Sequence, residues 1–122
     1  MRHRLSRIKK PKEFTIPLYG NKVWVSKGVS KEDFLKAVRM IDGDDLTTML
    51  KYGDAITITI DYANEPVIWV WFGSSSLSDI VHEITHISHE IMRSVGMTLT
   101  DSSEEAYAYL NDFLFNKIHN IK

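Results

Sequence analysis

The chain has 122 residues, the length of one ordinary domain, and its shares of hydrophobic (43%) and charged (25%) residues are those of a globular protein. It has no cysteine, which excludes disulfides, thiolate metal sites and a cysteine nucleophile. No apolar run approaches the roughly 20 residues of a membrane span, and the first residues lack the apolar centre of a signal peptide. We therefore expect no membrane partner and a cytoplasmic location.

The first twelve residues differ from the rest in charge. They hold six basic residues and no acid, whereas the other 110 hold nine Lys and Arg against 16 Asp and Glu, a formal charge of −7. This asymmetry predicts a flexible basic arm at residues 1–12 and a single domain at residues 13–122. The arm is either a solvated tail or a contact for an acidic surface or nucleic acid. We expect no other nucleic-acid contact.

The first elements expected after the arm are two short strands, FTIPL (14–18) and KVWVS (22–26), joined as a hairpin. A helix then begins after Ser30 and ends at Gly43, because these residue types cap the two ends of helices. Residues 44–52 are expected to form a second short helix or a turn.

The next two elements are clearer strands. AITITIDY (55–62) alternates apolar and polar residues, as a half-buried strand does, whereas VIWVWF (67–72) is apolar on both faces. A turn at residues 63–66 joins them as an antiparallel hairpin. Protein or a bound molecule must therefore cover both faces of the second strand. Trp69 and Trp71 are either core residues or face a substrate.

Two helices complete the predicted fold. The first begins at Ser76 or Ser78 and ends near Val95, where Gly96 can adopt a left-handed conformation. The last runs from Ser103 to about residue 119. The chain is therefore expected to form an α+β domain, in which a small antiparallel sheet packs with one early helix and two late helices.

The first of the late helices contains the stretch SDIVHEITHISHE (78–90). One helical turn separates His82 from His86 on one face, so both imidazoles can bind one zinc ion. Glu83 lies beside them and can accept a proton from a water on that metal. This His-Glu-x-x-His pattern predicts a zinc site with Glu83 as general base. The alternative is a pair of solvent-facing histidines on an amphipathic helix.

A third ligand must come from outside this motif, because His89 lies about 10.5 Å along the helix from His82. We expect a supporting or surface role for His89. The start of the last helix offers Glu104 and Glu105, and an antiparallel helix pair can bring a carboxylate there to the histidine face. Glu105 also fits a capping box with Ser102, in which it would bind only a backbone N–H.

The motif at residues 82–86, followed by a helix that contains a glutamate, resembles the gluzincin metallopeptidases, in which two histidines and a downstream glutamate bind zinc. The resemblance covers roughly residues 55–119, and the chain has the size of the minimal single-domain gluzincins (minigluzincins). It implies Glu105 as the third ligand, because the stretch 105–109 has the family's Glu-x-x-Ala spacing. Tyr109 stands where many gluzincins carry an acid, so the first histidine lacks its usual orienting carboxylate.

The sequence from residue 82 to residue 110 is also similar to small peptidase-like proteins of tailed bacteriophages. This resemblance implies the host cytoplasm or the virion as the location.

These features predict a zinc-dependent peptidase, with zinc held by His82, His86 and Glu105. Its substrate would be a peptide or protein that pairs with an exposed strand edge. Tyr109 is either a group that stabilises the oxyanion or a packed tyrosine. The alternative function is a non-catalytic metal-binding protein, such as a phage virion component or a host-directed effector. Its contact surfaces would be the basic arm and the strand at residues 67–72.

Overall fold

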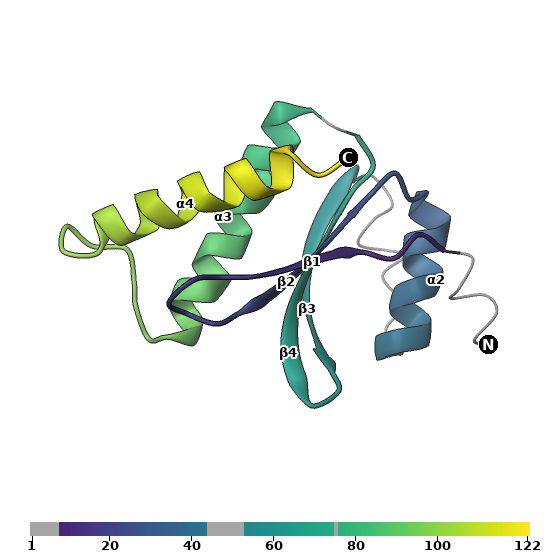
Figure 1. Ribbon diagram of the computed structural model, residues 1–122, viewed down its shortest axis with the longest axis horizontal. Helices are drawn as coiled ribbons and strands as arrows, with labels where there is room; N and C mark the ends of the chain where they lie inside the picture. The colour runs from purple at the N-terminus through teal and green to yellow at the C-terminus, as the bar shows by residue number, and fades with distance from the viewer. Residues whose placement is uncertain (1–7, 44–52, 75) are drawn as a thin grey trace.

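The computed structural model describes residues 8–43, 53–74 and 76–122, which form a sheet with helices on both faces (Figure 1). The expected α+β class is confirmed. The segment predicted as a short helix or turn at residues 44–52 lies outside the described residues, as do residues 1–7 of the arm. In chain order the elements are β1 (Lys12–Thr15), β2 (Lys22–Lys27), α2 (Lys31–Asp42), β3 (Ala55–Tyr62), β4 (Glu65–Phe72), α3 (Leu77–Ser94) and α4 (Glu104–His119).

The sheet has the strand order β1-β2-β4-β3 and is mixed. Its two hairpins, β1–β2 and β3–β4, are antiparallel as expected. The central strands β2 and β4, however, run parallel, from the pair Lys22 and Val67 to the pair Lys27 and Phe72. The expectation of a wholly antiparallel sheet is therefore corrected. A parallel pair needs a long connection, and α2 and β3 both lie between these two strands in the chain.

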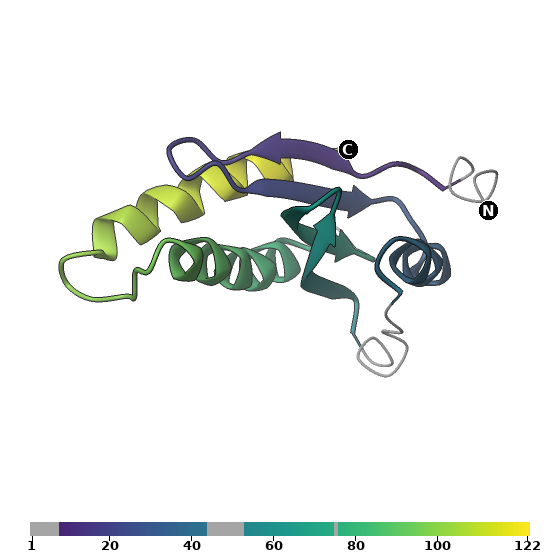
Figure 2. The same cartoon turned by 90° about the horizontal axis from the view of Figure 1, so that it is seen from below.

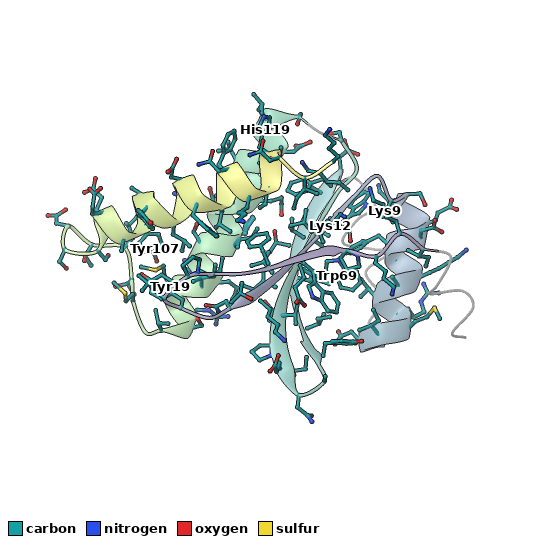
Figure 3. All side chains as sticks on the ribbon, viewed as in Figure 1. Lys9, Lys12, Tyr19, Trp69, Tyr107 and His119 are labelled. Atoms are coloured by element: carbon teal, nitrogen blue, oxygen red, sulfur yellow. The ribbon has the colours of Figure 1, made fainter. Side chains whose placement is uncertain are left out.

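Strand β4 is buried on both of its faces. Trp69 and its neighbours at alternate positions pack towards α2, whereas the residues between them pack towards α3 and α4. Figure 2 shows α2 on one side of the sheet and α3 with α4 on the other, and Figure 3 shows Trp69 and Tyr107 on opposite sides. The predicted alternation is confirmed. Because residues 67–72 are all buried, this strand is not an exposed contact surface.

The ends of α2 and α3 follow the predicted capping residues. The hydroxyls of Ser30 and Ser76 each accept a hydrogen bond from the backbone N–H three residues later. Gly43 and Gly96 adopt the left-handed conformation, with φ angles of 81° and 75°. These caps fix where α3 begins after β4, and therefore which residues of α3 face away from the sheet.

A buried lysine joins β2 to the end of α4. The Nζ of Lys27 donates hydrogen bonds to the carbonyl oxygens of Ile118 at 2.6 Å and Ile121 at 2.9 Å. Burial lowers the pKa of Lys27, and its ammonium is balanced by helix-end carbonyls, where a cation is favoured. This contact holds the C-terminal end of α4 against the sheet.

Replacing Lys27 with Met should therefore lower the free energy of unfolding by about 1–3 kcal/mol, because two carbonyl groups lose a charged donor. Urea unfolding followed by circular dichroism measures the change. Lys36→Met, at an exposed position of α2, is the control and should change the stability by less than about 0.5 kcal/mol. Equal stability of the two variants would show that the Lys27 contact does not hold α4.

Candidate metal centre

Helix α3 packs one face against the sheet and leaves its histidines on the other. The buried residues at helical spacing are Ile80, Ile84, Ile87 and Ile91. His82 and His86 lie one turn apart on the exposed side, and β3, the adjacent edge strand, packs beside the helix. The isoleucine stripe therefore determines the direction in which the histidine face points.

The two imidazole rings converge at the spacing that a metal requires. The Nε2 atoms of His82 and His86 lie 3.3 Å apart, and the ring planes are inclined at 71°. In a tetrahedral zinc site with Zn–N bonds of 2.0–2.1 Å, two ligand nitrogens lie about 3.3–3.4 Å apart. The pair thus fits two neighbouring positions of such a site. Without a metal, the same two nitrogens can share one proton as a hydrogen bond.

Glu83 is the buried acid of the site, with only 4% of its surface exposed. Its Oε1 accepts a hydrogen bond from the hydroxyl of Thr57 on β3 at 2.7 Å. Its Oε2 lies 3.8 Å from the Nε2 of His82. One carboxylate oxygen is therefore held by the edge strand, while the other lies near the point where the imidazoles converge. This arrangement suits a group that exchanges a proton with a water there.

A second carboxylate, that of Asp79, lies about one helical turn before His82. The hydroxyl of Ser74 donates to Oδ2 of Asp79 at 2.8 Å. The pKa of Asp79 is lowered first by this hydrogen bond and then by one from Ser76, with a smaller contribution from the charge of His82. Asp79 is therefore ionised at neutral pH and adds negative charge on the His82 side of the histidine pair.

Glu105 is not part of this group. It is exposed in the first turn of α4 and lines a depression beside Leu18 and Tyr19 of the β1–β2 turn. Within residues 8–43, 53–74 and 76–122, no three His, Cys, Asp or Glu side chains lie together so that they could hold one metal. Tyr109, which is 71% exposed, lines the same depression. The structure therefore places the carboxylate of Glu83 beside the ligand pair His82 and His86, whereas Glu105 and Tyr109 lie in a different depression.

Glu90, His89 and Glu105 do not take part in the group formed by His82, Glu83 and His86. Glu90 forms an ion pair with Arg93, and His89 is exposed. The capping box proposed for Glu105 is not seen, because α4 is capped at Ser103 without a side-chain hydrogen bond. Glu105 is thus engaged neither as a ligand nor as a cap.

The residue that sequence reasoning missed is Thr57. Its alternation with the isoleucines of β3 indicates which face of the strand it lies on, but it does not indicate which side chain it meets. Its contact with Glu83 joins residues 26 positions apart in the chain. Only the packing of α3 beside the sheet edge reveals it.

Comparisons with protein-family models, with curated proteins and with solved structures find no match for this chain. Within the part of the chain that the structure describes, no helix is both long and apolar enough to span a membrane.

Replacing Thr57 with Val should lower the free energy of unfolding by about 1–3 kcal/mol, because the buried Glu83 carboxylate loses its donor at nearly constant volume. The control is Thr59→Val, at an exposed position on the same strand. Urea unfolding at pH 7 measures both. If both variants unfold at the same urea concentration, Thr57 does not hold the carboxylate.

Proposed function

We propose that this chain is a zinc-dependent peptidase in which His82 and His86 bind the metal and Glu83 is the general base. The observation that carries the proposal is the 3.3 Å separation of the two Nε2 atoms, with the Oε2 of Glu83 beside them. The His-Glu-x-x-His motif alone predicts a ligand pair. The geometry adds that Thr57 holds one carboxylate oxygen of Glu83, while the other oxygen lies near His82.

The chain's own residues would act on protons in the reaction. Zinc bound by the histidines would supply a coordinated water with a pKa lowered towards 7. Oε2 of Glu83 would accept a proton from that water and would later deliver it to the leaving amine. The Thr57 hydroxyl keeps Oε1 in place during both transfers, so that the same oxygen faces the reaction.

The proposed substrate is an extended peptide lying along β3. Among the described residues this strand pairs only with β4, so its outer edge offers backbone N–H and C=O groups. A peptide that adds to a sheet edge is held by main-chain hydrogen bonds, largely independent of its sequence. Because Thr57 contacts Glu83, a peptide on this edge would pass beside the general base.

We propose Glu105 as the third ligand on the family resemblance. It lies beside the β1–β2 turn, so coordination requires the first turn of α4 to move towards the histidine face of α3. Zinc binding would then be coupled to the position of α4.

A non-catalytic metal-binding protein is the second candidate, and one observation favours it. The histidine pair has no third His, Cys, Asp or Glu ligand beside it among the described residues. Two imidazoles can hold a metal without forming a complete hydrolytic site.

The purified chain should bind about one equivalent of zinc, and His86→Ala should weaken this binding at least tenfold, because it removes a direct ligand. His89→Ala is the matched control, since His89 is an exposed histidine three residues along the same helix. Elemental analysis after dialysis and calorimetric titration measure content and affinity. Less than half an equivalent in the wild type, or an unchanged content in His86→Ala, would contradict the assignment.

The same titration tests the third ligand. Glu105→Ala should weaken zinc binding by about tenfold or more, whereas Glu104→Ala, at the adjacent exposed position, should not. Equal affinities for both variants would remove Glu105 from the ligand set.

Glu83→Gln should keep zinc and fold normally, because the amide oxygen can still accept from Thr57, but it should cleave peptides about 10²–10⁴-fold more slowly. Digestion of a proteome-derived peptide library, followed by mass spectrometry, compares this variant with the wild type. Equal cleavage by both would exclude Glu83 as the base. Zinc binding without any cleavage by the wild type would favour the second candidate.

A further inference from the structure

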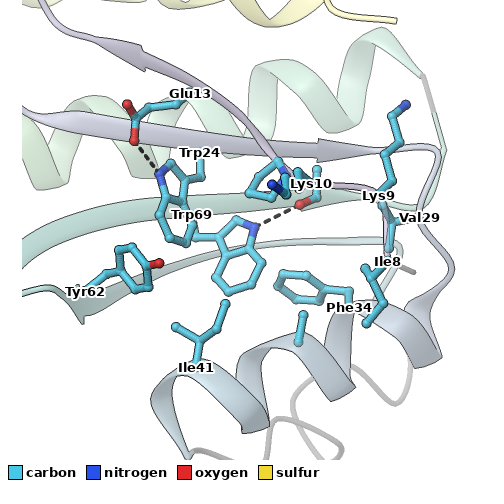
Figure 4. Close-up of a pocket in the computed structure, with 13 residues that line it drawn as sticks. Ile8, Lys9, Lys10, Glu13, Trp24, Val29, Phe34, Ile41, Tyr62 and Trp69 are labelled. Carbon is cyan, nitrogen blue, oxygen red and sulfur yellow. Dashed lines mark hydrogen bonds between the residues drawn. The ribbon is translucent and has the colours of Figure 1, made fainter. Parts of the chain in front are cut away.

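A cavity of about 580 Å³ lies on the face of the sheet opposite to the histidine pair (Figure 4). It is bounded by the segment before β1, by β2, β3 and β4, and by α2. Its volume falls within the range of about 300–1,000 Å³ that is typical of small-molecule sites. None of the proposed peptidase residues lines it.

The walls of the cavity are aromatic. The ring centroid of Trp24 lies 4.9 Å from that of Tyr62 and 5.3 Å from that of Trp69, and Phe34 lies 5.1 Å from Trp69. All three pairs are edge-to-face, so each ring is held by its neighbours. Tyr62 is 49% exposed. Such walls favour a flat ring as the occupant.

The indole N–H groups of Trp24 and Trp69 already donate hydrogen bonds within the protein. Trp24 donates from Nε1 to Oε1 of Glu13, and Trp69 donates from Nε1 to Oγ of Ser26, both at 2.9 Å. Few hydrogen-bond donors therefore remain for a polar ligand between the aromatic walls. The body of a bound molecule should be apolar, since a polar body would lose hydrogen bonds to water without replacing them.

The rim of the cavity is cationic. Lys9 and Lys10 line it, and Glu13 is the only acid among the described lining residues, with one oxygen bound to Trp24. Lys9 donates to the backbone oxygen of Lys122. Lys10 is exposed and makes no hydrogen bond or ion pair within residues 8–43, 53–74 and 76–122. It is therefore the group available to an anion.

We propose that this cavity binds a small planar aromatic anion, with its ring against Trp24, Trp69 and Tyr62 and its anionic group at Lys10. The aromatic walls, whose indole N–H groups already donate within the protein, select the ring, and the exposed Lys10 ammonium selects the charge. An aromatic carboxylate has this chemistry. The site is independent of the proposed peptidase centre.

Calorimetric titration of the 122-residue chain tests the proposal with 2-naphthoate and with neutral 2-naphthalenemethanol. We expect saturable binding of 2-naphthoate with a Kd below about 1 mM and at least about threefold weaker binding of the neutral compound. No binding of 2-naphthoate at 1 mM, or equal binding of the two compounds, would overturn the proposal.

Two variants locate the site. Lys10→Ala should raise the Kd of the bound anion about threefold to fivefold, whereas Lys12→Ala, at an exposed position on β1 that does not line the cavity, should not. Ala37→Leu adds bulk to the buried lining and should abolish binding of the ring. Equal effects of Lys10→Ala and Lys12→Ala would reject the assigned anion site.

A measurement on the unmodified chain does not depend on how the variants fold. In proton–nitrogen NMR spectra, the anion should shift the indole N–H signals of Trp24 and Trp69 more than that of Trp71, which does not line the cavity and donates to Val29. Equal shifts of all three signals, or the largest shift at Trp71, would place the ligand elsewhere.

Discussion

The burial of β4 on both faces is the constraint on which the rest of the structure depends. Six of its eight residues, those from Val67 to Phe72, are buried, and they include two tryptophans. Each large ring removes on the order of 150–250 Å² from water, which is worth several kcal/mol. A strand of this kind is stable only between two layers, so α2 covers one face and α3 with α4 the other. The candidate metal centre and the cavity therefore lie on opposite sides of the sheet.

The contact between Thr57 and Glu83 connects the sheet to the proposed general base. A buried carboxylate is costly unless a donor compensates it, and here the donor comes from the edge strand itself. The same hydrogen bond holds the acid beside the histidine pair and near the outer edge of β3, which pairs only with β4 among the residues that the structure describes. If a peptide adds to that edge, the group that positions the base belongs to the strand that binds the substrate.

The features that the sequence predicted correctly depend on neighbours in the chain. His82 and His86 converge because one helical turn separates them, and Ser30 and Ser76 cap helices through N–H groups three residues away. The period-two pattern of β4 predicted its two buried faces. Each of these follows from local backbone geometry.

The features that could not be predicted depend on how distant elements pack. The parallel pairing of β2 with β4 joins strands separated by α2 and β3, and no local pattern specifies it. The contact of Thr57 with Glu83 requires α3 to lie beside the edge strand. The position of Glu105 depends on how α4 crosses α3, and the spacing of 19 residues from His86 does not determine that crossing.

The most direct test of the central claim is the zinc K-edge X-ray absorption spectrum of the purified, zinc-loaded chain. We predict a first shell of four light atoms at about 2.0–2.1 Å, with the multiple-scattering signature of two imidazoles. In His86→Ala this signature should fall to one imidazole or disappear with the metal. A wild-type spectrum without imidazole scattering, or one that is unchanged in His86→Ala, would contradict the assignment of the histidine pair as the metal centre.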